Sequence, residues 1–369
     1  MVSVICVLFI LSFVLNSCNI YENHNIKIEE NRQDLFYFIS SGEKTFSPDE
    51  ITPSDWLNTF ISEGDTSQFV LYNTYMGELN VFNIDDCVFR KKAYIPLKSM
   101  DGIVCSGENL YIQDYDSATF YKLTNLTIVD TIVPWKNQKL RIAPSRVNIF
   151  NNVYECGTSM YFISYTMGEY DDKDRNVCLE YDKVDGSVSY FVNYPDVYSK
   201  ANWGGTSYRQ VFTCFNSTHD KIIFSFPISH NLTVFDCGLK TVEEIYAGSS
   251  CINEIKAFSN DKQERLNSEK SYRHFVANNS YAAIIYDKYR KLYYRIFELP
   301  YINRNGDAFK KVGVVILDEQ FKIVGEQVLG SFHGTTFLVI PDGILVPKIE
   351  EYPMIDAPMS YYLYKIGKK

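Results

Sequence analysis

Several common functional signatures are missing from this 369-residue sequence, and each absence excludes a class of site. No two cysteines have the C-x-x-C spacing of a zinc knuckle or a thioredoxin-like redox motif. The sequence has no G-x-S-x-G elbow, no H-E-x-x-H and no phosphate-binding Gly-Lys-Ser/Thr loop. Lys and Arg number 36 against 45 Asp and Glu, so the net charge is −9. An acidic chain lacks the basic face that nucleic-acid binding requires, and no cofactor motif is present.

The N-terminal apolar run is also too short for a membrane span. Residues 2–14 are almost wholly apolar, whereas a spanning helix needs roughly 20 such residues. The run fits the core of a secretory signal, which is about 7–15 residues long. It ends in Leu15-Asn16-Ser17-Cys18, which resembles the lipobox of bacterial lipoproteins, although no Lys or Arg precedes it. The alternative is a buried N-terminal strand that happens to contain a cysteine.

The lipobox resemblance divides the chain into three parts. It implies that residues 1–17 are a lipoprotein signal peptide and that Cys18 carries the lipid. The polar residues that follow make residues 18–33 a flexible tether between the membrane and the domain. Residues 34–369 are then one domain. The resemblance implies an exported protein that is lipid-anchored to the outer membrane of a Gram-negative bacterium.

Seven cysteines follow Cys18: Cys87, Cys105, Cys156, Cys178, Cys214, Cys237 and Cys251. Most lie in apolar runs such as "NVCLEY" and "VFTCF". We therefore expect mostly small buried side chains. One or two disulfides stay open for an exported protein, and the sequence identifies no pair.

Long helical periods are absent after the N-terminus, and short β-branched and aromatic runs recur between clusters of Gly, Asn, Asp and Ser. With 29 Tyr and 25 Phe, the composition suits half-buried strands. The runs group into units that begin near Phe69, Leu110, Met160, Ile222, Tyr281 and Phe337. Repeats of roughly 40–50 residues with about four strands each are typical of a β-propeller. The fold class is therefore all-β, most simply a propeller of six blades.

The sixth unit is one strand short. We expect the N-terminal segment Asp34–Ser40, "DLFYFIS", to supply that strand and close the ring. The alternative is two β-sandwiches joined through the polar run Asp261–Ser271, which could equally be a short surface helix between blades.

The segment "YDKYRKLYYRIFELP", together with the lipobox and the degenerate blades, resembles a family of Gram-negative lipoproteins of unknown function with a six-bladed propeller fold. The resemblance covers most of the mature chain. It implies the fold and the anchor but assigns no catalytic residue.

The same segment holds the most distinctive candidate binding residues. Tyr289, Arg290, Tyr293 and Arg295 interleave aromatic and basic side chains. Tyrosine faces stack on sugar rings and arginine forks bind carboxylates, so the pattern predicts a site for an acidic glycan or peptide. The alternative is a hairpin that turns at residues 288–291, in which one set of alternating side chains simply packs.

Other motifs are weaker. The five histidines, His24, His219, His230, His274 and His333, are scattered singly. His219 and His230 fall in or beside turns of one blade and could approach each other, but we expect turn residues or capped strand ends rather than metal ligands. Asp172, Asp174 and Asn176 copy the first ligands of a calcium loop. Val177 and Lys183 stand where that loop needs Gly and Glu, so we predict no metal site. Asp65-Thr66-Ser67, Asp116-Ser117-Ala118 and Asp130-Thr131-Ile132 resemble an O-glycosylation pattern of exported proteins in Gram-negative anaerobes.

Three functional hypotheses follow. The first is a lipid-anchored binding or protein-interaction module, with a glycan or peptide site on a loop face. The second is a carbohydrate-active enzyme that uses two carboxylates in the central funnel, with Asp114, Asp116 and Asp287 as examples near strand ends. The third is a structural subunit of an envelope complex. The side chains that line the funnel distinguish the first hypothesis from the second.

Overall fold

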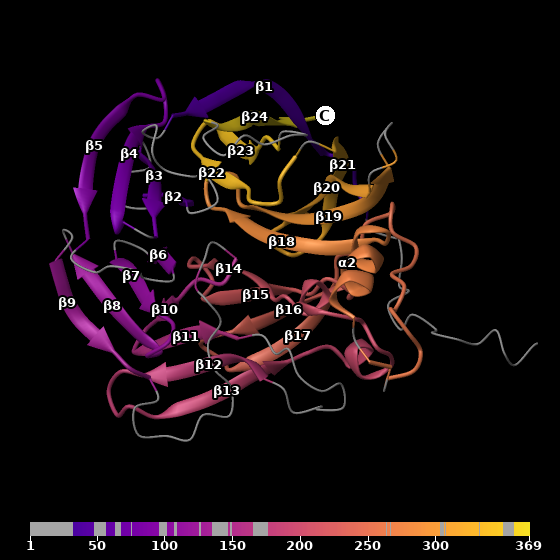
Figure 1. Cartoon of the computed structure of the whole chain (residues 1–369), viewed down its shortest axis with the longest axis horizontal. Coiled ribbons are helices and arrows are strands. Elements are labelled where there is room, and N and C mark those ends of the chain that lie inside the picture. The colour runs from indigo at the N-terminus through magenta and orange to yellow at the C-terminus, as the bar shows by residue number, and fades with distance from the viewer. Residues whose placement is uncertain are drawn as a thin grey trace, which may run out of the picture. The chain divides into compact units, whose positions relative to one another are not determined.

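In the part of the chain that the computed structural model describes, twenty-four strands form six antiparallel sheets of four strands, arranged around an axis (Figure 1). In chain order, blade 1 is β2 (Leu57–Ile61), β3 (Gln68–Asn73), β4 (Glu78–Asn83) and β5 (Phe89–Tyr94), and blade 2 is β6 (Gly102–Ser106), β7 (Asn109–Asp114), β8 (Thr119–Thr124) and β9 (Thr127–Ile132). Blade 3 is β10 (Tyr154–Cys156), β11 (Ser159–Ile163), β12 (Asn176–Asp182) and β13 (Val188–Asn193), and blade 4 is β14 (Phe212–Asn216), β15 (Lys221–Ser225), β16 (Asn231–Asp236) and β17 (Thr241–Tyr246). Blade 5 is β18 (Ser280–Asp287), β19 (Leu292–Ile302), β20 (Ala308–Asp318) and β21 (Ile323–Gly330), and blade 6 is β22 (Leu338–Ile340), β23 (Gly343–Pro347), β24 (Met359–Lys368) and β1 (Phe36–Phe46). The predicted six-bladed propeller is confirmed, and the two-sandwich alternative is wrong.

The structure describes residues 32–47, 57–62, 68–74, 76–95, 102–106, 109–124, 127–134, 147, 150–164, 176–262, 264–265, 267–302, 306, 308–331, 333–349 and 358–369. All of them belong to one compact unit, Asn31–Lys369. Among these residues, no helix has the length and apolar character needed to span a membrane. Cys18, the signal peptide and almost all of the expected tether lie outside the described residues.

The ring closes through its N-terminal strand, as the sequence predicted. β1 pairs antiparallel with β24 from Phe36 opposite Lys368 to Phe46 opposite Met359. The residues before β1 bind to blade 5. The Gln33 amide donates to the Ile323 carbonyl at 3.0 Å, and Arg32 forms an ion pair with Glu326. Arg32 and Gln33, which the prediction placed in the tether, therefore already contact the propeller.

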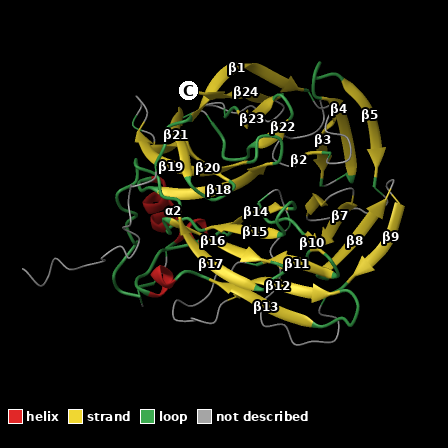
Figure 2. Ribbon diagram, turned by 180° about the vertical axis from the view of Figure 1, so that it is seen from behind, coloured by secondary structure: helices red, strands yellow, loops and turns green. Residues whose placement is uncertain are grey.

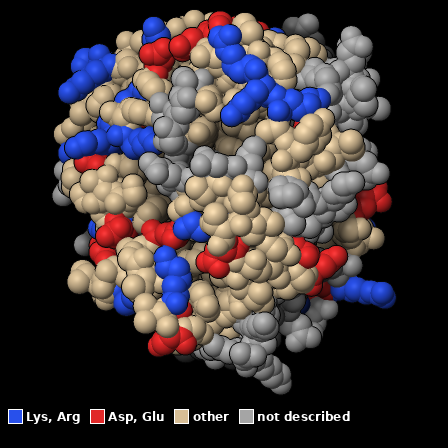
Figure 3. Space-filling model, turned by 90° about the vertical axis from the view of Figure 1, so that its left-hand side faces the viewer, with Lys and Arg blue, Asp and Glu red and all other residues tan. Residues whose placement is uncertain are grey.

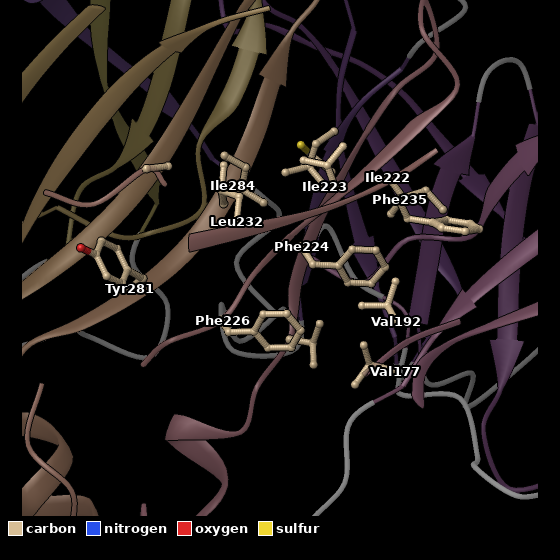
Figure 4. Packing of buried hydrophobic residues seen from close by; sticks show 14 of the residues in the cluster. Val177, Val192, Ile222, Ile223, Phe224, Phe226, Leu232, Phe235, Tyr281 and Ile284 are labelled. Atoms are coloured by element: carbon tan, nitrogen blue, oxygen red, sulfur yellow. The ribbon is translucent and has the colours of Figure 1, made fainter. Parts of the chain in front are cut away.

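Apolar side chains fill the spaces between neighbouring blades. The largest cluster joins blades 3, 4 and 5, and Figure 4 shows Val177 and Val192 facing Phe224 and Phe226, with Tyr281 beyond them. Because inner strands pack on both faces, residues 69–73 of β3 are all buried. The outer strands are polar instead, and β5 exposes Arg90, Lys91 and Lys92. Figure 3 shows basic side chains in the upper half of the face on which β5 lies. Charged outer edges discourage pairing with other chains.

Among the described residues, helical structure is confined to the connections around blade 4 (Figure 2). The described helices are η2 (Asp196–Ser199), η3 (Thr206–Tyr208) and α2 (Ser268–Val276). Asn267 caps α2 by accepting from the Lys270 amide. The helix expected at Asp261–Ser271 thus overlaps α2 only at its end.

The six cysteines whose side chains are described, Cys87, Cys156, Cys178, Cys214, Cys237 and Cys251, are free thiols, and three of them are buried.

Candidate functional site

The first strands of the six blades surround a central cavity of about 530 Å³. This volume lies in the range of small-molecule sites, about 300–1,000 Å³. Its described lining consists of Phe60, Ile61, Ile103, Val104, Asn109, Phe150, Asn152, Tyr154, Glu155, Thr213, Cys214, Phe215, Ser217, Ile284, Ile285, Tyr286, Lys288, Tyr289, Phe337, Leu338 and Val339. The first strands of all six blades contribute, so the cavity lies on the axis of the ring.

The cavity has two unlike walls. β22, β2 and β6, with the residue before β22, supply only apolar residues: Phe337, Leu338, Val339, Phe60, Ile61, Ile103 and Val104. Blades 3 to 5 supply most of the polar groups, including Asn152, Thr213, Ser217 and Lys288. The site therefore suits a ligand with an apolar side and a polar side.

Glu155 is the only carboxylate in the described lining, and neighbouring groups already bind it. It accepts from Asn109 at 3.1 Å and from Tyr111, and it pairs with Lys183 at 2.9 Å and Lys122 at 3.8 Å. Burial alone would raise the pKa of Glu155, but these hydrogen bonds and ammonium charges hold it below its ordinary value. Glu155 is thus a compensated carboxylate, and its low pKa does not suit a general acid.

Three polar side chains on the lining have no described partner for hydrogen bonding or ion pairing. Ser217 follows β14, and Lys288 and Tyr289 stand in the turn after β18. The Lys288 ammonium lies 5.6 Å from the centre of the Tyr289 ring. Within the described lining, these groups add one uncompensated positive charge and two hydroxyls to the polar wall.

The predicted binding segment forms a hairpin, and its turn lies at residues 288–291 as the alternative interpretation expected. Arg290 is held by the buried Asp287 at 2.7 Å, and it donates to the Pro341 carbonyl at 2.6 Å. Arg290 therefore fastens blade 5 to the turn of blade 6.

Tyr293 and Arg295 are fully buried between blades 4 and 5. Arg295 donates at 2.7 Å both to the Ser229 carbonyl and to the His230 carbonyl, and its guanidinium lies 3.8 Å from the Tyr281 ring centre. Burial lowers the pKa of Arg295 to about 10. The structure thus places only Tyr289 of the four candidate residues on the cavity, and it does not join them into one surface.

The remaining candidates lie apart from the cavity. Asp114, Asp116 and Asp287, named for the enzyme alternative, are not among the lining residues. His219 lies in the turn after β14 and His230 in the turn before β16, at opposite ends of β15, so the two histidines do not approach each other. Across the described residues, no group of three His, Cys, Asp or Glu is placed to hold a metal. Asp172 and Asp174 lie outside the described residues.

The sequence identified the first strands poorly, which is why most lining residues were missed. β10 has three residues and β6 and β14 have five each. Short apolar strands give little periodicity, and which side chains face the axis depends on the twist and register of each blade. Of the lining residues, only those in the Tyr-Lys pattern of residues 286–289 could be predicted from the sequence as candidates for binding.

Comparison with known proteins supports the fold. A family model described as a domain of unknown function (DUF4221) matches residues 36–328. The crystal structure of a DUF4221 family member from Bacteroides vulgatus is similar with a TM-score of 0.70 and 17% identity, over 92% of this chain and 100% of that one. The crystal structure of a predicted exported protein from Bacteroides fragilis is similar with a TM-score of 0.52 and 11% identity, over 92% of this chain and 98% of that one. No curated protein matches the sequence.

Proposed function

The chain belongs to the DUF4221 family, whose function is unknown, and from this premise we propose that it is a binding module that takes its ligand into the central cavity. The cavity carries this proposal. It is a concave, mostly apolar site with a few polar groups on one side, the usual composition of a small-ligand pocket.

The ring also suits a preformed site. Each lining strand belongs to a four-stranded sheet, and apolar clusters pack each sheet against both neighbouring blades. Binding to such a frame costs little conformational entropy. The compensated Glu155 and the absence of a second carboxylate from the described lining favour binding over the two-carboxylate enzyme hypothesis.

We further propose that the protein is exported and lipid-anchored through Cys18. The lipobox-like Leu15-Asn16-Ser17-Cys18 supports the anchor, and the similarity to a predicted exported protein from Bacteroides fragilis fits export. The membrane is then one partner, and the outer membrane of a Gram-negative bacterium is the proposed location.

A pair of substitutions on one turn tests cavity binding. Ser217 lines the cavity, whereas the adjacent exposed Thr218 does not. A chemically varied library of peptides, sugars and organic acids is screened by thermal shift, and hits are measured by calorimetry. A ligand at 100 times its Kd stabilises the protein by about 2.7 kcal/mol. We expect Ser217→Tyr to weaken every hit at least tenfold and Thr218→Tyr to leave affinity unchanged. If the hits bind the Ser217→Tyr variant with unchanged affinity, their site lies outside the cavity. A library without hits would contradict the proposal.

A further inference from the structure

Building on the proposed function, we infer that the cavity binds the free C-terminal carboxylate of a short apolar peptide, with Lys288 as the carboxylate-binding residue. The inference depends on the charge balance of the polar wall and on the composition of the apolar wall.

Charge is uncompensated at one point of the described lining. The carboxylate of Glu155 is already matched by Lys122 and Lys183. Lys288 has no carboxylate partner among the described residues, and the Ser217 and Tyr289 hydroxyls share its end of the cavity. One ammonium beside two hydroxyls favours a ligand with one anionic group, because hydrogen bonds between charged groups are the strong ones.

The three residues lie at the same end because of the topology. The turns that join first to second strands, such as 217–220 and 288–291, occupy one face of the ring, which we call the turn face. Ser217, Lys288 and Tyr289 belong to these turns. An anionic group bound there leaves the rest of the ligand to extend along the first strands into the cavity.

The opposite wall favours peptide over sugar. A sugar has hydroxyls around its ring, and those facing Ile61, Val104 and Leu338 would lose water without gaining a partner. Apolar peptide side chains instead gain by leaving water for that wall. The amide groups of the peptide can meet Ser217 and Tyr289 on the polar wall.

Matched ligands test the carboxylate. N-acetylated apolar tripeptides are prepared as free acids and as C-terminal amides, and calorimetry measures both against the full-length protein. We expect the acids to bind at least tenfold more tightly than the amides. Lys288→Met should abolish this preference. Lys291→Met, on the same turn but outside the lining, should retain it, and circular dichroism verifies that both variants fold.

Each contrary result has a distinct meaning. Acids and amides that bind equally, with no effect of Lys288→Met, would overturn carboxylate recognition while leaving cavity binding intact. Lys288-dependent binding of uronic-acid oligosaccharides, with no peptide binding, would overturn the peptide class. Failure of every library compound to bind the wild-type protein would overturn the proposed function itself.

Discussion

Arg295 shows how a residue that the sequence predicts to bind a ligand at the surface can instead hold two blades together. Its guanidinium is fully buried and bonds to the Ser229, His230 and Ala247 carbonyls rather than to any described carboxylate. These carbonyls belong to blade 4, whereas Arg295 belongs to blade 5. One side chain therefore donates hydrogen bonds to three buried backbone carbonyls of a neighbouring blade.

Removing that side chain should be costly. We expect Arg295→Met to lower the free energy of unfolding by about 3–5 kcal/mol, because three buried carbonyls lose their charged donor. Chemical denaturation measures the change. Arg273→Met is the control, since Arg273 is largely exposed and its only described side-chain partner is Glu269 one helical turn away; its effect should stay below about 0.5 kcal/mol. Equal effects of the two substitutions would contradict this role.

His230 predicts how stability depends on pH. Its ring is buried beside the Arg295 guanidinium and the Tyr281 hydroxyl, 2.8 Å from Nδ1. Burial, with the Arg295 charge, lowers its pKa from 6.5 to about 4. As pH falls below about 6.5, His230 is therefore protonated in the unfolded chain but stays neutral in the folded chain. Stability is intact above that pH and is lost toward pH 4, by about 2 kcal/mol between pH 7 and pH 5.

The comparison of wild type with His230→Gln isolates this contribution, since other groups titrate equally in both. Denaturation at pH 7 and pH 5 should show a smaller loss in the variant. Parallel losses in the two proteins would mean that His230 does not titrate between folded and unfolded states as described.

At the scale of elements, one turn design recurs at the ends of strands. Asp182, Asp236 and Asp287 each end a strand, and the amide four residues later donates to the Asp carbonyl at 2.9, 2.8 and 2.7 Å, respectively. That later residue has a positive φ: 73° at Gly186, 57° at Lys240 and 55° at Lys291. Asp suits the first position because its side chain also accepts from turn amides, as Asp287 does from Tyr289 and Arg290.

The design implies that Lys291→Gly stabilises the protein. A residue with a Cβ is strained in the left-handed region by about 1–2 kcal/mol, and glycine is not. After its entropic cost of roughly 0.5–1 kcal/mol, we expect a net gain of about 0.5–1 kcal/mol in denaturant unfolding. The matched exposed site Lys288, which has no positive φ, should lose stability on substitution by Gly. A loss at both positions would argue against the strain.

The same scale explains what the sequence could predict. The turn residues and apolar runs located the second, third and fourth strands well, since Phe69, Leu110, Met160 and Ile222 all lie in second strands. The short first strands of blades 1 to 4 were missed, and with them most of the cavity. The sequence also could not predict which side chains of β19 are exposed. Alternation of apolar and polar residues distinguishes the two faces of a strand only when one face is in contact with water. Both faces of β19 pack on neighbouring blades, so Tyr293 and Tyr294 are equally buried.

For the whole ring, closure depends on a close approach at Gly325. A Cβ there would lie 2.3 Å from the Phe36 carbonyl oxygen, where the N-terminal strand passes blade 5. We expect Gly325→Ala to displace that strand and to cost about 1–3 kcal/mol, seen as a lower unfolding midpoint and faster proteolysis before β1. In contrast, Gly238→Ala meets only an ordinary contact at 3.5 Å and should change neither. Unchanged proteolysis in Gly325→Ala would show that the ring is held by other contacts.

The entry point of the chain bears on how the propeller would sit at a membrane. Gln33 pairs with Ile323 at the start of β21, and because strands alternate in direction this end of β21 lies on the turn face, with Ser217 and Lys288. The residues between Cys18 and Arg32 span at most about 50 Å when fully extended. A lipid on Cys18 would thus hold Arg32 within about 50 Å of the bilayer. We expect Cys18→Ser to move the protein from the membrane fraction to the soluble fraction, and the wild-type mass to show a lipidated N-terminal cysteine. Cys6→Ser, within the expected signal peptide, should leave both results unchanged. A wild-type product that keeps residues 1–17, or a Cys18→Ser protein that stays with the membrane, would contradict the anchor.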